Sequence, residues 1–139
     1  MGNSQSMQKI NYEDIQYVIK NQAHILINTL SEKEQECLIP NTINVNQEEE
    51  IINQLIRNGN KQIKIIIYGR NCNDEKIYTK YNQLTSLGFY NIFLYTGGIF
   101  EWLLLQDIYG AKEFPTTKKE IDLLKYKPNK VFGIQLLEY

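Results

Sequence analysis

The architecture of this chain of 139 residues is indicated by the stretch at residues 63–75, IKIIIYGRNCNDE. A β-branched apolar run at 63–68 leads into a polar loop at 69–75, and a helical pattern then continues to Leu87. A second apolar run follows at 92–95. This order predicts a βαβ unit, in which a helix joins two parallel strands. The loop after the first strand is the usual ligand site of such a unit, because free N–H groups at the helix start attract anions.

Strand-like and helix-like segments alternate along the rest of the chain, which predicts an α/β domain with a central parallel sheet. Further strands are expected from Ile10, over 24–27 and after a turn at 37–45, and further helices over 12–20, from 48–50 to Gly59, over 102–109 and over 121–124. Ser31 with Glu34, and Thr117 with Glu120, have the spacing of capping boxes at helix starts. The acids at 48–50 fit the first turn of a helix better than a metal site, because they complement the helix dipole.

Length and composition predict one globular domain with an ordinary hydrophobic core. The net charge of −1 gives no basic field for nucleic acid. Cys37 and Cys72 are expected to be thiols in a reducing compartment, Cys37 as a packing residue. His24 is the only histidine and has no neighbouring ligand at metal spacing, so we expect no metal site and no cofactor. No apolar run approaches the roughly 20 residues that cross a bilayer.

The two ends of the chain are predicted to lie outside the folded domain. Residues 1–9 form a flexible N-terminus in which Gly2 and Ser6 match the N-myristoylation pattern. The domain is expected over 10–127. One acyl chain on Gly2 would give only weak membrane contact. The tail at 128–139 is apolar enough to need a partner surface, either on this domain or on another protein.

Four short motifs, in this order and spacing, resemble the rhodanese-like family. Residues 39–45 (IPNTINV) are similar to its IPGAINI segment, and 66–68 to the strand that delivers its active loop. Residues 87–92 (LGFYNI) resemble LGFxNV, and 97–102 (GGIFEW) resemble GGxxxW. The resemblance covers about residues 10–110. It implies a three-layer fold, with a central parallel sheet flanked by helices, and a sulfurtransferase active loop after the strand.

The loop departs from what the resemblance implies at both of its functional positions. The family's chemistry needs a cysteine directly after the strand, with its thiolate held by loop N–H groups, but Gly69 stands there. Asp74 stands where the family's arginine would fall, and a carboxylate repels an anionic donor. We expect Asn73 or Asp74 to cap the next helix, using the amides that a substrate would need. The family's DVR segment is replaced by 28–30 (NTL).

An alternative enzymatic interpretation uses Cys72, which lies three residues past the expected position. In it, loop amides and Arg70 activate Cys72 as the persulfide-carrying nucleophile of a sulfurtransferase. A displacement of this size would miss an amide cradle that must be accurate to about half an ångström. A phosphatase would need Cys-x5-Arg, and residues 73–80 contain no arginine.

The sequence therefore predicts a rhodanese-like domain with a degenerate active-site loop: Gly69, Arg70, Asn71, Cys72, Asn73 and Asp74. We expect no catalytic residue, and a structural or protein-interaction role in which the tail contacts a protein partner. Inactive relatives occur in cytoskeletal and ciliary assemblies, so the resemblance implies such a microtubule-associated setting in the cytoplasm. The expected location becomes membrane-peripheral if Gly2 is acylated. No nucleic acid partner and no transmembrane segment are expected.

Overall fold

The computed structural model describes residues 7–133 and contains a five-stranded sheet. Its strands are β1 (Gln8–Ile10), β2 (His24–Asn28), β3 (Thr42–Ile43), β4 (Lys64–Tyr68) and β5 (Ile92–Tyr95). Their order across the sheet is β1-β5-β4-β2-β3, and every neighbouring pair is parallel. The predicted α/β class is confirmed. The predicted acylation site Gly2 and the last part of the tail, 134–139, lie outside the described residues.

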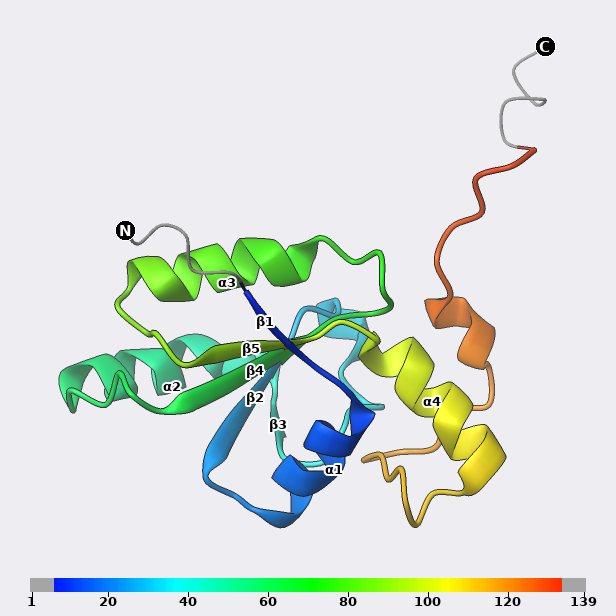
Figure 1. Ribbon diagram of the computed structural model, residues 1–139, viewed down its shortest axis with the longest axis horizontal. Coiled ribbons are helices and arrows are strands. Elements are labelled where there is room, and N and C mark those ends of the chain that lie inside the picture. Colours follow the sequence, from blue (N-terminus) through cyan, green and yellow to red (C-terminus); the bar gives the residue numbers. More distant parts are fainter. Residues whose placement is uncertain (1–6, 134–139) are drawn as a thin grey trace.

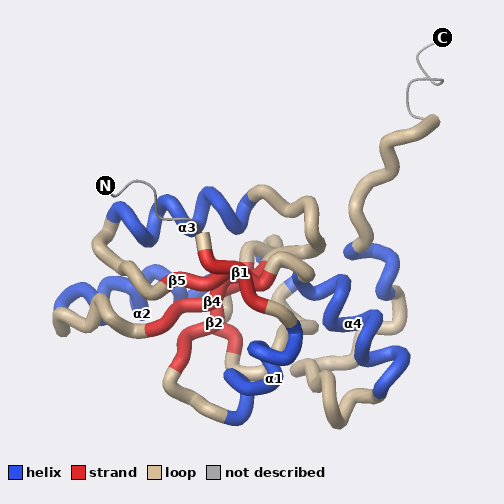
Figure 2. The backbone as a smooth tube through the Cα atoms, viewed as in Figure 1, coloured by secondary structure: helices blue, strands red, loops and turns tan. Residues whose placement is uncertain are grey.

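Helices cover both faces of the sheet and give a three-layer arrangement (Figures 1 and 2). The helices are α1 (Tyr12–Lys20), α2 (Val45–Arg57), α3 (Lys76–Ser86) and α4 (Gly98–Tyr109), with 3-10 turns η2 (Glu32–Glu34) and η3 (Leu123–Tyr126). One apolar core lies between the sheet and α1 and α4, and also contains Tyr126 of η3. The second core lies between the sheet and α2 and α3.

Strand β4 lies at the centre of the sheet and carries the loop that follows it. Residues 65–68 are all buried, as expected for a parallel strand that is covered on both faces. The hydroxyl of Tyr68 accepts a hydrogen bond from the N–H of Ile39 at 3.2 Å and lies 2.8 Å from Thr42 Oγ1. The end of β4 is therefore tied to the chain before β3, which holds the start of the loop in place.

Several sequence-based boundaries differ from the structure. Strand β1 ends at Ile10 instead of beginning there, and the helix expected over 121–124 is the 3-10 turn η3. Helix α2 begins at Val45, after its N-cap Asn44, because the Asn44 side chain accepts the N–H of Asn46 at 3.0 Å. Of the acids at 48–50, Glu48 lies in the first turn as predicted, and Glu49 and Glu50 follow it inside the helix. Helix α4 already begins at Gly98. Thr117 starts no helix: it accepts the N–H of Leu38 at 3.0 Å and so binds the far segment instead.

The described part of the chain contains no helix that is long and apolar enough to cross a membrane. The same residues contain no group of three or more His, Cys, Asp or Glu side chains placed to hold a metal ion.

Candidate functional site

The loop between β4 and α3 folds around the carboxylate of Asp74. Asp74 Oδ2 accepts the N–H of Arg70 at 2.9 Å and the hydroxyl of Thr29 at 3.0 Å. Asp74 Oδ1 accepts the N–H of Lys76, the first residue of α3, at 2.9 Å. The N-cap of α3 is Glu75, which makes no side-chain capping bond, so the prediction that Asn73 or Asp74 is the N-cap is wrong. The negative group that accepts hydrogen bonds from the N–H groups of the loop and of the start of α3 is thus a side chain of the protein itself.

Gly69 has no room for a side chain in this arrangement. A Cβ atom added to Gly69 would lie 2.1 Å from Asp74 Oδ2 and 2.7 Å from Thr29 Oγ1. Both distances are far below van der Waals contact, and both neighbours are held by hydrogen bonds. The Asp74 carboxylate therefore fills the space that a larger residue at position 69 would need. An aspartate at position 74 in this place requires a glycine at position 69.

The carbonyl groups of the loop are bound by the start of α4. The N–H of Ile99 donates to the carbonyl of Gly69, and the N–H of Phe100 to that of Arg70, both at 2.9 Å. Gly98 permits this approach, because its φ is +70° and an added Cβ would lie 2.7 Å from the Gly69 carbonyl oxygen. Gly98 of the GGIFEW motif therefore lets the start of α4 lie directly against the loop backbone.

Arg70 points away from the loop centre and is fully engaged. Its guanidinium pairs with Glu34, donates to the carbonyl of Lys125 and lies over the ring of Tyr126, with Cζ 5.2 Å from the ring centroid. Burial alone would raise the pKa of Glu34, but hydrogen bonds from Arg70 and Ser31 hold this pKa below its usual value. Arg70 is therefore a structural cation, neither a solvated charge nor a group that faces a substrate anion.

The C-terminal segment closes the outer side of the loop. Asn71 is buried, its Nδ2 donates to the carbonyl of Tyr126 at 2.8 Å, and its Oδ1 accepts the N–H of Asn73 at 2.9 Å. The Tyr126 side chain is only 1% exposed and packs in the core with α4. Residues 123–126 thus belong to the folded domain, and the loop is held between them and the sheet.

Cys72 lies on the outer surface of the loop, where it is exposed. Its Sγ lies 3.8 Å from Asn73 Oδ1, and it borders an open depression of about 520 Å³ with Glu75 and Tyr78. It does not approach the Asp74 carboxylate or the Arg70 guanidinium through any hydrogen bond in the described residues. The partners of the Arg70 guanidinium are Glu34 and the carbonyl of Lys125, and the alternative pair Cys72 and Arg70 stays a prediction.

The second thiol is structural. Cys37 is buried beside Tyr126, and burial raises its pKa. His24, in β2, is partly exposed, and its Nδ1 lies 3.3 Å from the carbonyl of Asn21.

Three further residues shape the loop and were not predicted as site residues: Thr29, Glu34 and Tyr126. Thr29 lies in the segment where the family's charged pair was absent, and its hydroxyl takes part in holding Asp74. Glu34 was expected only as a capping residue, and its carboxylate accepts the N–H of Ser31 at 3.3 Å as well as pairing with Arg70. Tyr126 carries no motif, so only the three-dimensional structure could place it at the loop.

The family model for the rhodanese-like domain matches residues 12–105, about two thirds of the chain. The chain belongs to the rhodanese-like domain family. The match includes the whole loop and the part of α4 from Gly98 to Leu105. It ends before the C-terminal segment that covers the loop. The resemblance inferred from the four motifs is thereby confirmed. Among curated proteins, no sequence matches this rhodanese-like domain.

Solved structures support the fold assignment. The rhodanese-like domain of the Anabaena sp. Alr3790 protein, solved by NMR, aligns with a TM-score of 0.58 and 17% identity, over 93% of this chain and 92% of that one. The single-domain sulfurtransferase RDL2 of Saccharomyces cerevisiae aligns with a TM-score of 0.58 and 16% identity, over 77% of this chain and 97% of that one. At such identities the likeness concerns the fold.

Proposed function

We propose that this rhodanese-like domain has lost sulfurtransferase activity and acts as a structural or protein-interaction module. The proposal depends on one observation: a Cβ at position 69 would lie 2.1 Å from Asp74 Oδ2. The position that delivers the family's nucleophile is thus a glycine whose neighbouring space is filled by a carboxylate. Fold alone does not restore an activity whose reacting group is missing.

Electrostatics also supports the proposal. A persulfide or oxyanion intermediate needs N–H donors and a cation directed at it. Here the N–H groups of Arg70 and Lys76 donate to Asp74, and the Arg70 guanidinium is paired with Glu34. A thiosulfate-like anion that entered the loop would meet the Asp74 carboxylate rather than free donors.

A thiosulfate–cyanide assay on the full chain tests the loss of activity, with Cys72→Ala as the matched control. We expect thiocyanate formation at the uncatalysed rate for both proteins. Turnover by the wild-type chain that Cys72→Ala abolishes would contradict the proposal and establish the alternative sulfurtransferase, with exposed Cys72 as its persulfide carrier.

The interaction role is supported by the described part of the tail. Val131 and Phe132 are 75% and 91% exposed, and large apolar side chains at such exposure are typical of a contact surface. By analogy with inactive relatives, we place the protein partner in a cytoskeletal or ciliary assembly in the cytoplasm. Purification from the native source, followed by identification of what accompanies the chain, tests this. Intact-mass measurement of the same material tests acylation of Gly2, since an unmodified N-terminal amine would remove the lipid from the proposal.

A further inference from the structure

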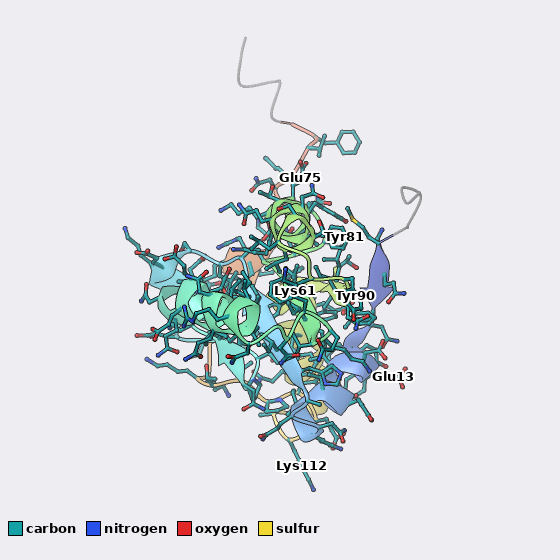
Figure 3. The ribbon with its side chains drawn as sticks, turned by 90° about the vertical axis from the view of Figure 1, so that its left-hand side faces the viewer. Glu13, Lys61, Glu75, Tyr81, Tyr90 and Lys112 are labelled. Carbon is teal, nitrogen blue, oxygen red and sulfur yellow. The ribbon has the colours of Figure 1, made fainter. Side chains whose placement is uncertain are left out.

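A groove runs between the loop and the C-terminal segment. Its volume is about 930 Å³, and it is bounded by residues 70–76 on one side and by 124–131 on the other. Glu75, labelled in Figure 3, lies on its rim at the end of the molecule from which the C-terminal segment departs. The groove lies outside the closed centre of the loop, so its surface is available to a ligand that the loop itself cannot take.

The lining of this loop groove is positively charged. Lys76, Lys127 and Lys130 line it and are exposed, and within residues 7–133 none of them forms an ion pair with a carboxylate. Two further carboxylates of the region are already engaged, since Glu34 pairs with Arg70 and Glu120 with Lys125. In a chain of net charge −1, this is a local concentration of free positive charge.

Two negative groups also line the groove, and they do not cancel this charge. The Asp74 carboxylate keeps its charge but is directed into the loop, where it accepts hydrogen bonds from the Thr29 hydroxyl and from the main-chain N–H groups of Arg70 and Lys76. Glu75 is exposed and lines the same groove, so three unpaired lysines stand against two carboxylates. The excess of cations remains, and a ligand of opposite charge is the one that complements it.

Exposed apolar side chains lie in the same groove. Leu124 is 59% exposed and Val131 is 75% exposed, and both are lining residues. Phe132 follows directly and is 91% exposed. Apolar side chains among cations favour a protein segment over nucleic acid, because phosphate contacts alone would leave these side chains in water.

We propose that the loop groove binds an acidic segment of a partner protein whose apolar side chains pack against Leu124 and Val131. This inference rests on the proposed function, since it names the surface through which an interaction module would work. It assigns the carboxylates of the partner to Lys76, Lys127 and Lys130. Under this proposal the loop contributes to a binding surface, although its centre is filled by the Asp74 carboxylate.

The test uses the ¹⁵N-labelled full chain and a short synthetic peptide of alternating glutamate and leucine. Two control peptides replace leucine by serine or glutamate by lysine. We expect the acidic apolar peptide to shift amide signals of residues 70–76 and 124–131, with weaker binding of the serine control and none of the basic one. Shifts confined to other surfaces, or equal binding of all three peptides, would overturn the proposal.

Charge-reversal variants provide the matched comparison. The triple variant Lys76→Glu, Lys127→Glu, Lys130→Glu should bind about tenfold more weakly or worse. A second triple variant changes exposed lysines elsewhere, Lys20→Glu, Lys64→Glu and Lys112→Glu, and should bind as the wild type does. In Figure 3, Lys112 projects at the end of the molecule opposite Glu75. Equal loss in both triple variants would reduce the effect to net charge and contradict the proposal.

Two further outcomes separate this inference from its rivals. Anionic phosphatidylserine vesicles that bind the chain, while the acidic peptide does not, would overturn it in favour of a membrane surface. Turnover in the thiosulfate–cyanide assay that depends on Cys72 would overturn the proposed function alone, because the shifts at the loop groove do not depend on Cys72 chemistry.

Discussion

The side chain of Asn71 donates a 2.8 Å hydrogen bond to the main-chain carbonyl of Tyr126. This bond joins the loop after β4 to a segment that lies beyond the family-matched residues 12–105. Arg70 strengthens the connection, because its guanidinium donates to the carbonyl of Lys125 and lies over the Tyr126 ring. The loop after β4 is thus covered by a part of the chain that lies outside the family match.

We predict that Tyr126→Ala destabilises the domain by about 3 kcal/mol or more, as truncation of a large buried aromatic side chain does. Its ring is 1% exposed and packs in the core with Trp102 and Phe114. The free energy of unfolding from urea denaturation measures the loss. Tyr126→Phe keeps the ring and should cost far less.

The tail beyond this residue should behave differently. Deletion of 129–139 removes exposed Val131 and Phe132 and should change the free energy of unfolding by no more than about 0.5 kcal/mol. Its predicted effect is weaker assembly with the partner. A deleted form that fails to fold would show that the tail belongs to the core.

Gly69 and Asp74 should be coupled energetically. Gly69→Ala introduces a Cβ 2.1 Å from Asp74 Oδ2 and should cost about 1–3 kcal/mol through overpacking. Asp74→Gly removes three hydrogen bonds and should cost about 1–3 kcal/mol. In the double variant the clash with the Asp74 carboxylate is absent and only the close contact with Thr29 Oγ1 remains, so its destabilisation should fall below the sum by about 1 kcal/mol. Additive costs would mean that the two positions do not share one space.

The ion pair of Glu34 and Arg70 should make stability depend on pH. Because the pKa of Glu34 is lower in the folded chain, its contribution is present above the unfolded value near 4.5 and is lost as pH falls through the lower folded pKa. At pH 7 we expect Glu34→Gln to be less stable than wild type by about 1 kcal/mol, since the pair is partly exposed.

The measurement for this pair is urea denaturation of both proteins at several pH values. The difference in free energy of unfolding should stay constant above about pH 5 and shrink at lower pH, where Glu34 becomes neutral like glutamine. Other carboxylates, such as Glu120, are common to both proteins and cancel in the difference. A difference that persists unchanged to pH 3 would refute the assignment.

The two thiols should differ strongly in reactivity. Cys72 is exposed, whereas Cys37 is buried and has a raised pKa, so the native chain should show one fast and one slow reaction with a thiol-specific disulfide reagent. We expect a rate ratio on the order of a hundredfold, because Cys37 reacts only when the structure opens. Cys72→Ala should remove the fast phase alone, and Tyr126→Ala should accelerate the slow one.

Local patterns in the sequence predicted most of the fold. The β-branched run at 63–68 and the apolar run at 92–95 predicted β4 and β5 because a parallel strand that is buried on both faces needs continuous apolar residues. Four family motifs predicted the rhodanese-like arrangement. Thr117 shows the limit of such patterns, because its capping-box spacing was overruled by hydrogen bonds to residues 36 and 38 far along the chain.

By itself, the sequence determined the α/β class, the family and the glycine at position 69, since each depends on residue identity or on local patterns. Only the tertiary structure decided that Asp74 and Gly69 share one space, that Arg70 faces Glu34, and that Tyr126 covers the loop. These relationships join segments up to 55 positions apart. No local propensity encodes such a contact, because it exists only after the sheet has brought those segments together.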